Sequence, residues 1–238
     1  MKKLTIFTLS LMTLLTCACG KSSDSSESQS APAAEQQVVL QVSADADINK
    51  CAYSLDELYD SAAIVMKVRV GSVQAKLAEN DAFNVYTEVV PEVLEVYKGE
   101  YSGEKIIIGG GKISVSEYAE KFDTDFSALS DNETENGLVE YIWLNNHIPS
   151  AGEELVFFGT TNPGYPDCFE PSFLNQGVFV CQGDSVRISS LNADENWCEP
   201  LAEDIMSRFG GSLSDGGLVF PASEMETFLQ KPVNPTQQ

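Results

Sequence analysis

The stretch SLDELYDSAAIVMKVRVGSV, residues 54–73, indicates the fold class of this chain. It opens with the spacing of a helix capping box, Ser54 at the cap and Glu57 three residues later, so we expect a short helix to about Asp60. From Ala63 onward, apolar side chains alternate with charged ones, which is the period of a half-buried strand. The alternating residues are Met66, Lys67, Val68, Arg69 and Val70. A helix that lies on a core and leads into a strand therefore opens the folded domain.

Beyond this stretch, short segments with a strand pattern recur along the chain. We expect strands at residues 83–90, 92–97, 104–108, 138–144, 154–160, 177–181 and 185–189. Pro91 separates the first two, and because proline cannot donate a backbone hydrogen bond to a sheet, this position must be an edge or a bulge. Helical periodicity returns only at 200–209 and 223–229, whereas the acidic, turn-rich residues 123–137 are expected to form a surface excursion. The chain is therefore predicted to be mainly β with a few short helices.

Three segments of this region together resemble a known group of exported bacterial domains. They are SLDELYDSAAIVMKVRVGSV, VYTEVVPEVLEVYKGEYSGEKIII and AGEELVFF, and the resemblance covers about residues 51–160. The group is related to the tissue inhibitors of metalloproteinases and the netrin module, which implies an OB-like antiparallel barrel, here with a C-terminal extension. In those inhibitors a cysteine at the mature N-terminus coordinates the protease's metal. Cys51 is internal, so that chemistry does not carry over to this chain.

The first twenty residues have the features of an export signal. Lys2 and Lys3 precede an apolar stretch at residues 4–16, which is shorter than the roughly 20 residues that cross a bilayer. The following TCACG resembles the lipobox of bacterial lipoproteins, in which the processed chain begins with an acylated cysteine. The resemblance favours lipid attachment at Cys19, with Cys17 as the alternative; an ordinary cleaved signal peptide that releases a soluble protein is the competing interpretation.

These features define a domain organisation with a lipid tether. We predict a signal peptide at 1–18, a lipidated cysteine and flexible stalk at 19–45, one globular domain at 46–231 and a disordered tail at 232–238. Several acyl chains on one cysteine anchor a protein almost permanently, because each buried methylene contributes about 0.8 kcal/mol. The partner of the tether is then the lipid bilayer, and the domain faces outside the cytoplasm at the cell membrane.

Four further cysteines lie in the exported part, and an even number in an oxidising compartment indicates disulfides. They are Cys51, Cys168, Cys181 and Cys198. Three pairings are open; we favour a local bridge between Cys168 and Cys181 and a second one between Cys51 and Cys198. A zinc site is the weaker interpretation, because the chain has no CxxC pair and only one histidine.

The charge of the chain excludes one class of partner. Acidic residues outnumber basic ones by 36 to 14, giving a net charge of -22 at pH 7, and no basic run with interleaved aromatic residues occurs. Nucleic-acid binding depends on basic surfaces that release counterions from phosphates. We therefore expect no nucleic-acid partner, and we interpret the acidity as that of a well-solvated surface.

Motifs for catalysis, cofactors or metals are incomplete. His147 lies in a turn-like context without a G-x-S-x-G elbow, and we expect it to be an exposed loop residue. Residues 109–112, GGGK, lack the spacing of a phosphate-binding loop. The acidic segment 123–134 resembles a calcium loop but has Ala128 where glycine is required, and segment 45–50 fails at Lys50. The sequence thus predicts no catalytic, cofactor-binding or metal-binding residue.

The leading functional hypothesis is a non-enzymatic binding or interaction module, with a protein or glycan ligand, held outside the cytoplasm by its lipid anchor. OB barrels commonly bind such ligands on one face. Two alternatives come from other classes: a secreted hydrolase that uses carboxylates, and a structural lipoprotein of the cell envelope.

Overall fold

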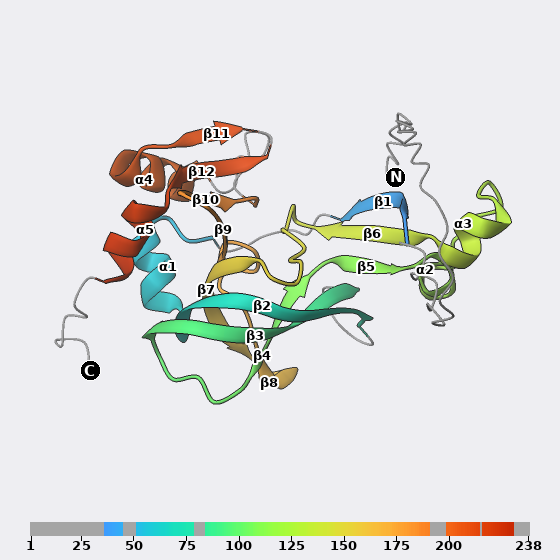
Figure 1. Cartoon of the computed structure of the whole chain (residues 1–238), viewed down its shortest axis with the longest axis horizontal. Helices are drawn as coiled ribbons and strands as arrows, with labels where there is room; N and C mark the ends of the chain where they lie inside the picture. The colour runs from blue at the N-terminus through green and yellow to red at the C-terminus, as the bar shows by residue number, and fades with distance from the viewer. Residues whose placement is uncertain (1–35, 45–50, 79–83, 191–198, 215, 231–238) are drawn as a thin grey trace, which may run out of the picture. The chain divides into compact units, whose positions relative to one another are not determined.

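Five strands pair in a closed ring, in the order β2, β3, β4, β8, β7 and back to β2. The computed structural model in Figure 1 describes residues 36–44, 51–78, 84–190, 199–214 and 216–230. The strands of the ring are β2 (Ile64–Leu77), β3 (Val85–Lys98), β4 (Lys105–Gly109), β7 (Glu154–Asn162) and β8 (Tyr165–Pro171). Four of the five pairings are antiparallel, and the pairing of β4 with β8 is parallel. The ring confirms the mainly β, OB-like barrel, with one parallel pair that the prediction of an antiparallel barrel did not contain.

The stretch that indicated the fold class forms helix α1 (Leu55–Ser61) and the first strand of the ring. The Ser54 hydroxyl accepts a hydrogen bond from the Glu57 backbone N–H at 3.2 Å, as predicted. The Glu57 carboxylate, however, accepts from the backbone N–H of Tyr53 at 2.8 Å instead of that of Ser54. The predicted cap is therefore confirmed at the Ser54 end and is displaced by one residue at the other end.

The predicted alternation in β2 positions the barrel core. Met66, Val68 and Val70 are at most 1% exposed and belong to the apolar cluster inside the ring. The cluster consists of Ile64, Met66, Val68, Val70, Val89, Ile106, Ile108, Leu155, Phe157, Phe169, Val178 and Val180. Pro91 pairs with Val70, and the register shifts between Val70 and Ser72, so the proline lies at a bulge and β3 continues through it. The prediction of an edge or a bulge at Pro91 is confirmed.

A C-terminal extension continues the sheet beyond β7. It contains β9 (Val178–Gln182), β10 (Ser185–Ile188), β12 (Gly217–Pro221) and β11 (Ser212–Ser214), in that order. Helices α4 (Glu199–Phe209) and α5 (Ala222–Leu229) lie with α1 beside these strands (Figure 1). The three helices bury a second apolar cluster against the outer side of the sheet, with Val65 of β2 and Phe158 of β7 in it. The predicted extension and its two helices are confirmed.

A smaller three-stranded sheet has the order β1, β6, β5. The segment between β4 and β7 contributes β5 (Gly111–Ser114), α2 (Val115–Phe122), α3 (Asp131–Asn136) and β6 (Leu138–Trp143). Ser114 and Glu117 form a capping box that begins α2, a sequence signal that our prediction overlooked. Helix α3 has no buried residue, so the acidic segment 123–137 does lie at the surface there, although part of it is helical.

The predicted stalk was wrong at its C-terminal end. Residues Val38–Ala44 form strand β1, which pairs in parallel with β6. Its apolar side chains Val39, Leu40 and Val42 pack against the third apolar cluster, around Tyr141 and Trp143. This contact removes apolar surface from water and so stabilises the strand. The folded unit therefore begins before residue 46. The predicted signal peptide, most of the stalk, Cys17, Cys19, Cys198 and the tail at 232–238 lie outside the described residues.

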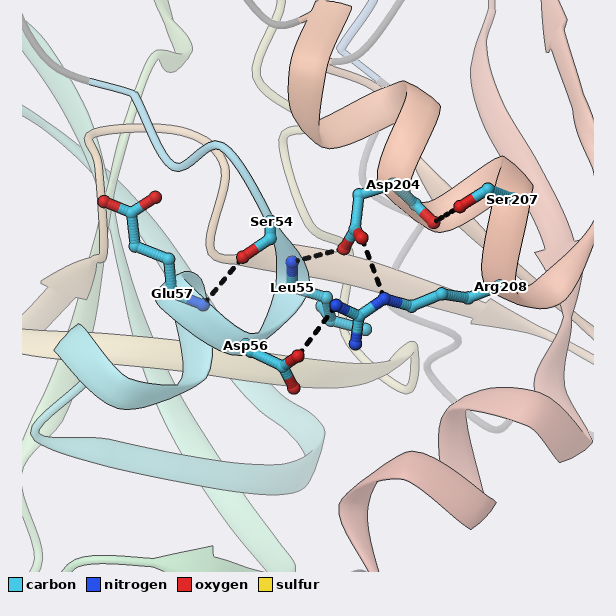
Figure 2. Close-up of polar contacts among 7 residues, drawn as sticks. All are labelled: Ser54, Leu55, Asp56, Glu57, Asp204, Ser207 and Arg208. Atoms are coloured by element: carbon cyan, nitrogen blue, oxygen red, sulfur yellow. Dashed lines mark hydrogen bonds and ion pairs between the residues drawn. The ribbon is translucent and has the colours of Figure 1, made fainter. Parts of the chain in front are cut away.

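An ionic junction fixes α4 against the start of α1 (Figure 2). One carboxylate oxygen of Asp204 accepts a hydrogen bond from the Leu55 backbone N–H at 2.8 Å, and the other accepts from Arg208 Nε at 2.8 Å. Arg208 also reaches Asp56, with Nη2 at 2.7 Å from its carboxylate. Since the first N–H groups of a helix have no partner within the helix, Asp204 acts as a second cap for α1 that comes from a distant part of the chain.

Candidate functional site

A pocket of about 300 Å³ lies where helix α5 meets strands β2, β3, β7, β9 and β10. Its floor is apolar and consists of Val156, Val186, Met225 and Leu229, each at most 4% exposed. Met225 and Leu229 are four residues apart, so they share the face of α5 that packs on the sheet. Glu226 follows Met225 directly, so it lies at the border of that face and forms part of the pocket wall.

Charged side chains surround this floor. Glu153, Glu154, Glu226 and Lys67 line the pocket, so three carboxylates accompany one ammonium group. Lys67 Nζ lies 3.8 Å from Glu154 and 3.7 Å from Glu226. Glu154 also accepts a hydrogen bond from Arg69 at 2.8 Å. Lys67 and Arg69 are the charged residues that alternate along β2, so the face predicted to contact water supplies one wall of the pocket.

Two further lining groups, the phenol of Tyr97 and the thiol of Cys181, stay protonated at neutral pH. Burial raises the pKa of Tyr97 far above its ordinary value, and a hydrogen bond with Glu95 and the charge of Glu226 raise it further. Burial also raises the pKa of the Cys181 thiol; the nearby Lys67 opposes this shift, while Glu154 and Glu226 add to it. A thiol in this state is a poor nucleophile, because the thiolate is the reactive form.

His147 lies in a loop, as predicted, but next to the pocket and mostly shielded from water. Its Nε2 is 2.8 Å from a carboxylate oxygen of Glu153, which also accepts a hydrogen bond from the Ser150 backbone N–H at 2.8 Å. The side chain of His147 is only 17% exposed, so the predicted exposed histidine was wrong. The turn from His147 to Glu153 therefore holds one wall of the pocket in place.

The predicted bridge between Cys168 and Cys181 was also wrong, because both cysteines carry free thiols. Cys168 lies on β8 and belongs to the cluster around Tyr141 and Trp143, whereas Cys181 lies on β9 and packs against the cluster under the helices. Strand β7 pairs with both strands along different parts of its length, and the two thiols belong to separate cores. Cys51 has no disulfide partner among the described cysteines; its predicted partner Cys198 lies outside the described residues, so that pairing stays a prediction.

Part of the barrel's outer face is covered by the chain itself. Ile107 of β4, Tyr86 of β3 and Cys168 of β8 are buried in the cluster that includes Tyr141 and Trp143 of β6. OB barrels usually bind their ligands on the face of the second and third strands, which are β3 and β4 here. In this chain the smaller sheet therefore occupies part of the surface on which we expected a ligand.

An ion-pair network lies beside the covered surface. Glu88 accepts hydrogen bonds from Lys105 at 2.7 Å and from Lys76 at 2.9 Å. Burial alone raises the pKa of Glu88, but the hydrogen bonds from Lys105 and Lys76 outweigh it and hold the pKa below its ordinary value. The network joins β2, β3 and β4 and satisfies its own charges, so we interpret it as structural.

The acidic segments that resembled calcium loops do not converge on a site. Asp123 ends helix α2 in the left-handed conformation, and Asp125 accepts a hydrogen bond from the backbone of Ser127. Among the residues that the structure describes, no group of three His, Cys, Asp or Glu side chains is arranged to hold a metal ion. The segment at 45–50 lies outside those residues.

No protein-family model matches the sequence, and no curated protein matches it. In the described part of the chain, none of the helices combines the length and the apolar character needed to cross a bilayer. The features of the chain that bear on function are therefore the pocket and the N-terminal sequence.

Proposed function

We propose that this protein is an exported, lipid-anchored binding module of the OB-like barrel class, with its ligand site in the pocket beside α5. The observation that carries the proposal is the combination of an apolar floor with a charged wall. Ligand sites in proteins are typically concave, largely apolar and equipped with a few polar groups that orient the ligand. This pocket combines an apolar floor with charged groups that could orient a ligand.

The state of the pocket's reactive groups supports binding without catalysis. The surroundings of two lining groups, the thiol of Cys181 and the phenol of Tyr97, favour the protonated and weakly nucleophilic form. Activated nucleophiles instead need a lowered pKa or an adjacent general base. A ligand in this pocket would contact carboxylates and hydrocarbon, which suits recognition.

A substitution that fills the pocket tests its role. Ala222 lines the pocket at the start of α5, and its neighbour Ser223 is exposed and does not line it. We expect Ala222→Phe to abolish ligand capture, measured by native mass spectrometry after incubation with fractionated small-molecule and glycan extracts. Ser223→Phe, the matched control, should bind as the wild type does. Equal binding by both variants, or turnover of the captured ligand, would contradict the proposal.

The anchor requires a separate test in cells. We expect an alkyne-bearing palmitate analogue to label the full-length protein in an expressing bacterium, and Cys19→Ala to abolish the label because the acylated residue is then missing. Cys17→Ala should remain labelled. An unlabelled wild-type protein would refute the lipid anchor and leave the binding proposal to be judged by the pocket variants.

A further inference from the structure

We infer that the pocket beside α5 recognises a primary alkylammonium group carried on a hydrocarbon chain. The inference rests on the proposed function and names the ligand class of the same site. It depends on three observations: the balance of charge in the pocket wall, the apolar floor, and the position of Lys67 between two carboxylates.

The charge balance favours a cation. Three carboxylates, those of Glu153, Glu154 and Glu226, line the pocket. They outnumber two cations, Lys67 in the lining and Arg69, which pairs with Glu154 from beside the pocket. The whole chain also carries a net charge of -22, so its field attracts cations and repels anions. An anionic ligand would have to leave water beside several carboxylates, which is unfavourable in a partly enclosed site.

The floor favours an organic cation over a metal ion. Val156, Val186 and Leu229 offer only hydrocarbon and Met225 a soft thioether, so the floor gains from contact with an alkyl chain and provides no oxygen ligand for a hard metal ion. The carboxylates do not converge as metal ligands do: in the described ranges no cluster of three suitable side chains forms a metal site. A hydrocarbon chain with an ammonium end matches both parts of the pocket.

Lys67 already places an alkylammonium group in this environment. Its Nζ lies 3.7 Å from Glu226 and 3.8 Å from Glu154, so it occupies the gap between the two carboxylates. The side chains of Lys67 and Glu154 are 25% and 34% exposed, so water screens this pair only in part, whereas the Glu226 side chain is 58% exposed and its pair with Lys67 is screened more strongly. A bound amine would compete with Lys67 for these oxygens. Removing the internal competitor should therefore strengthen binding, a result that a merely structural ion pair does not predict.

The test compares three probes with the same chain length, hexylamine, 1-hexanol and hexanoate, by isothermal titration calorimetry at low ionic strength and pH 7. We expect hexylamine to bind most tightly. Glu226→Gln should weaken its binding by about threefold, the effect of one partly exposed ion pair, and Lys67→Met should strengthen it by a similar factor. Glu224→Gln is the matched control, because Glu224 is exposed on the same helix and does not line the pocket.

The outcomes separate the inference from the proposed function. If 1-hexanol or hexanoate binds best and Ala222→Phe abolishes that binding, the site is right and the ligand class is wrong. If none of the three probes binds, the ligand class is wrong, and the comparison of Ala222→Phe with Ser223→Phe on the extracts decides whether the site itself is right. Weaker hexylamine binding by Lys67→Met would also overturn the inference. Circular dichroism checks that each variant is folded.

A free alkylamine and the side chain of a lysine share this chemistry. Nα-acetyl-lysine N-methylamide, which keeps the side-chain ammonium group, serves as the probe for a polypeptide ligand, and tighter binding of this compound than of hexylamine would identify a protein as the source of the amine. Alkylation of Cys181 shows where hexylamine binds, because Cys181 lines the pocket and Cys168 does not. Hexylamine should slow the alkylation of Cys181 by iodoacetamide and leave that of Cys168 unchanged; equal rates at Cys181 with and without hexylamine would place the ligand elsewhere.

Discussion

Replacement of Asp204 by alanine tests how the helices of the extension are held together. The substitution removes the acceptor for the Leu55 backbone N–H and one of the ion-pair partners of Arg208. Loss of a helix cap costs about 1 kcal/mol. The side chains of Asp204 and Arg208 are 18% and 28% exposed, so their ion pair contributes about 1 kcal/mol at most, and Arg208 keeps its contact with Asp56. The free energy of unfolding should therefore fall by about 2 kcal/mol.

Urea denaturation followed by circular dichroism measures this loss. In a thermal scan the same change should lower Tm by about 4–8 °C, as expected for a domain of this size. Asp204→Asn retains an oxygen that can accept from the Leu55 N–H, so it should lose about half as much stability. Glu203→Ala, at the exposed neighbouring position on α4, is the control. If Asp204→Ala loses no more stability than Glu203→Ala, the capping argument is refuted.

Three other predictions concern the backbone, the thiols and the response to pH. Gly217 has a φ of +109°, and a Cβ there would lie 2.3 Å from the Ile188 carbonyl oxygen, so Gly217→Ala should cost more than about 2 kcal/mol in urea unfolding; a smaller loss would show that the turn adapts. Cys168 and Cys181 should both be alkylated in denaturant without reductant, and mass spectrometry that finds them linked would contradict the structure. Because the pKa of Glu88 is lowered on folding, its stabilising contribution is present at neutral pH and is lost as the pH falls below about 4.5. Glu88→Gln should flatten the dependence of stability on pH in this range, and an unchanged dependence would count against the lysine network.

Local patterns were sufficient to predict much of the barrel. The alternation along β2, the cap at Ser54 and the bulge at Pro91 each depend on neighbours close in sequence, and each was confirmed. Strand β1 was missed because its pairing partner is distant: Leu40 pairs with Val139 of β6, in parallel. A strand of this kind has no nearby turn that would reveal its partner.

The pocket could not be predicted for the same reason. Lys67, Glu154 and Glu226 come from β2, β7 and α5, and only the closed barrel and its extension bring them together. The predicted bridge between Cys168 and Cys181 failed for the opposite reason. The two cysteines are near in sequence, but they belong to different apolar clusters. Separation in sequence is a poor guide to distance in space wherever one strand belongs to two parts of a sheet.

Strand β7 belongs to the ring and to the extension at once. Residues 154–157 pair with β2 on one side and with β9 on the other, so the backbone amides of this short segment are protected from both edges. The barrel and the extension should consequently melt in a single cooperative step, and the slowest hydrogen exchange should be found in this segment. A chain truncated before β9 would expose an unpaired edge along β7 and would be prone to aggregate.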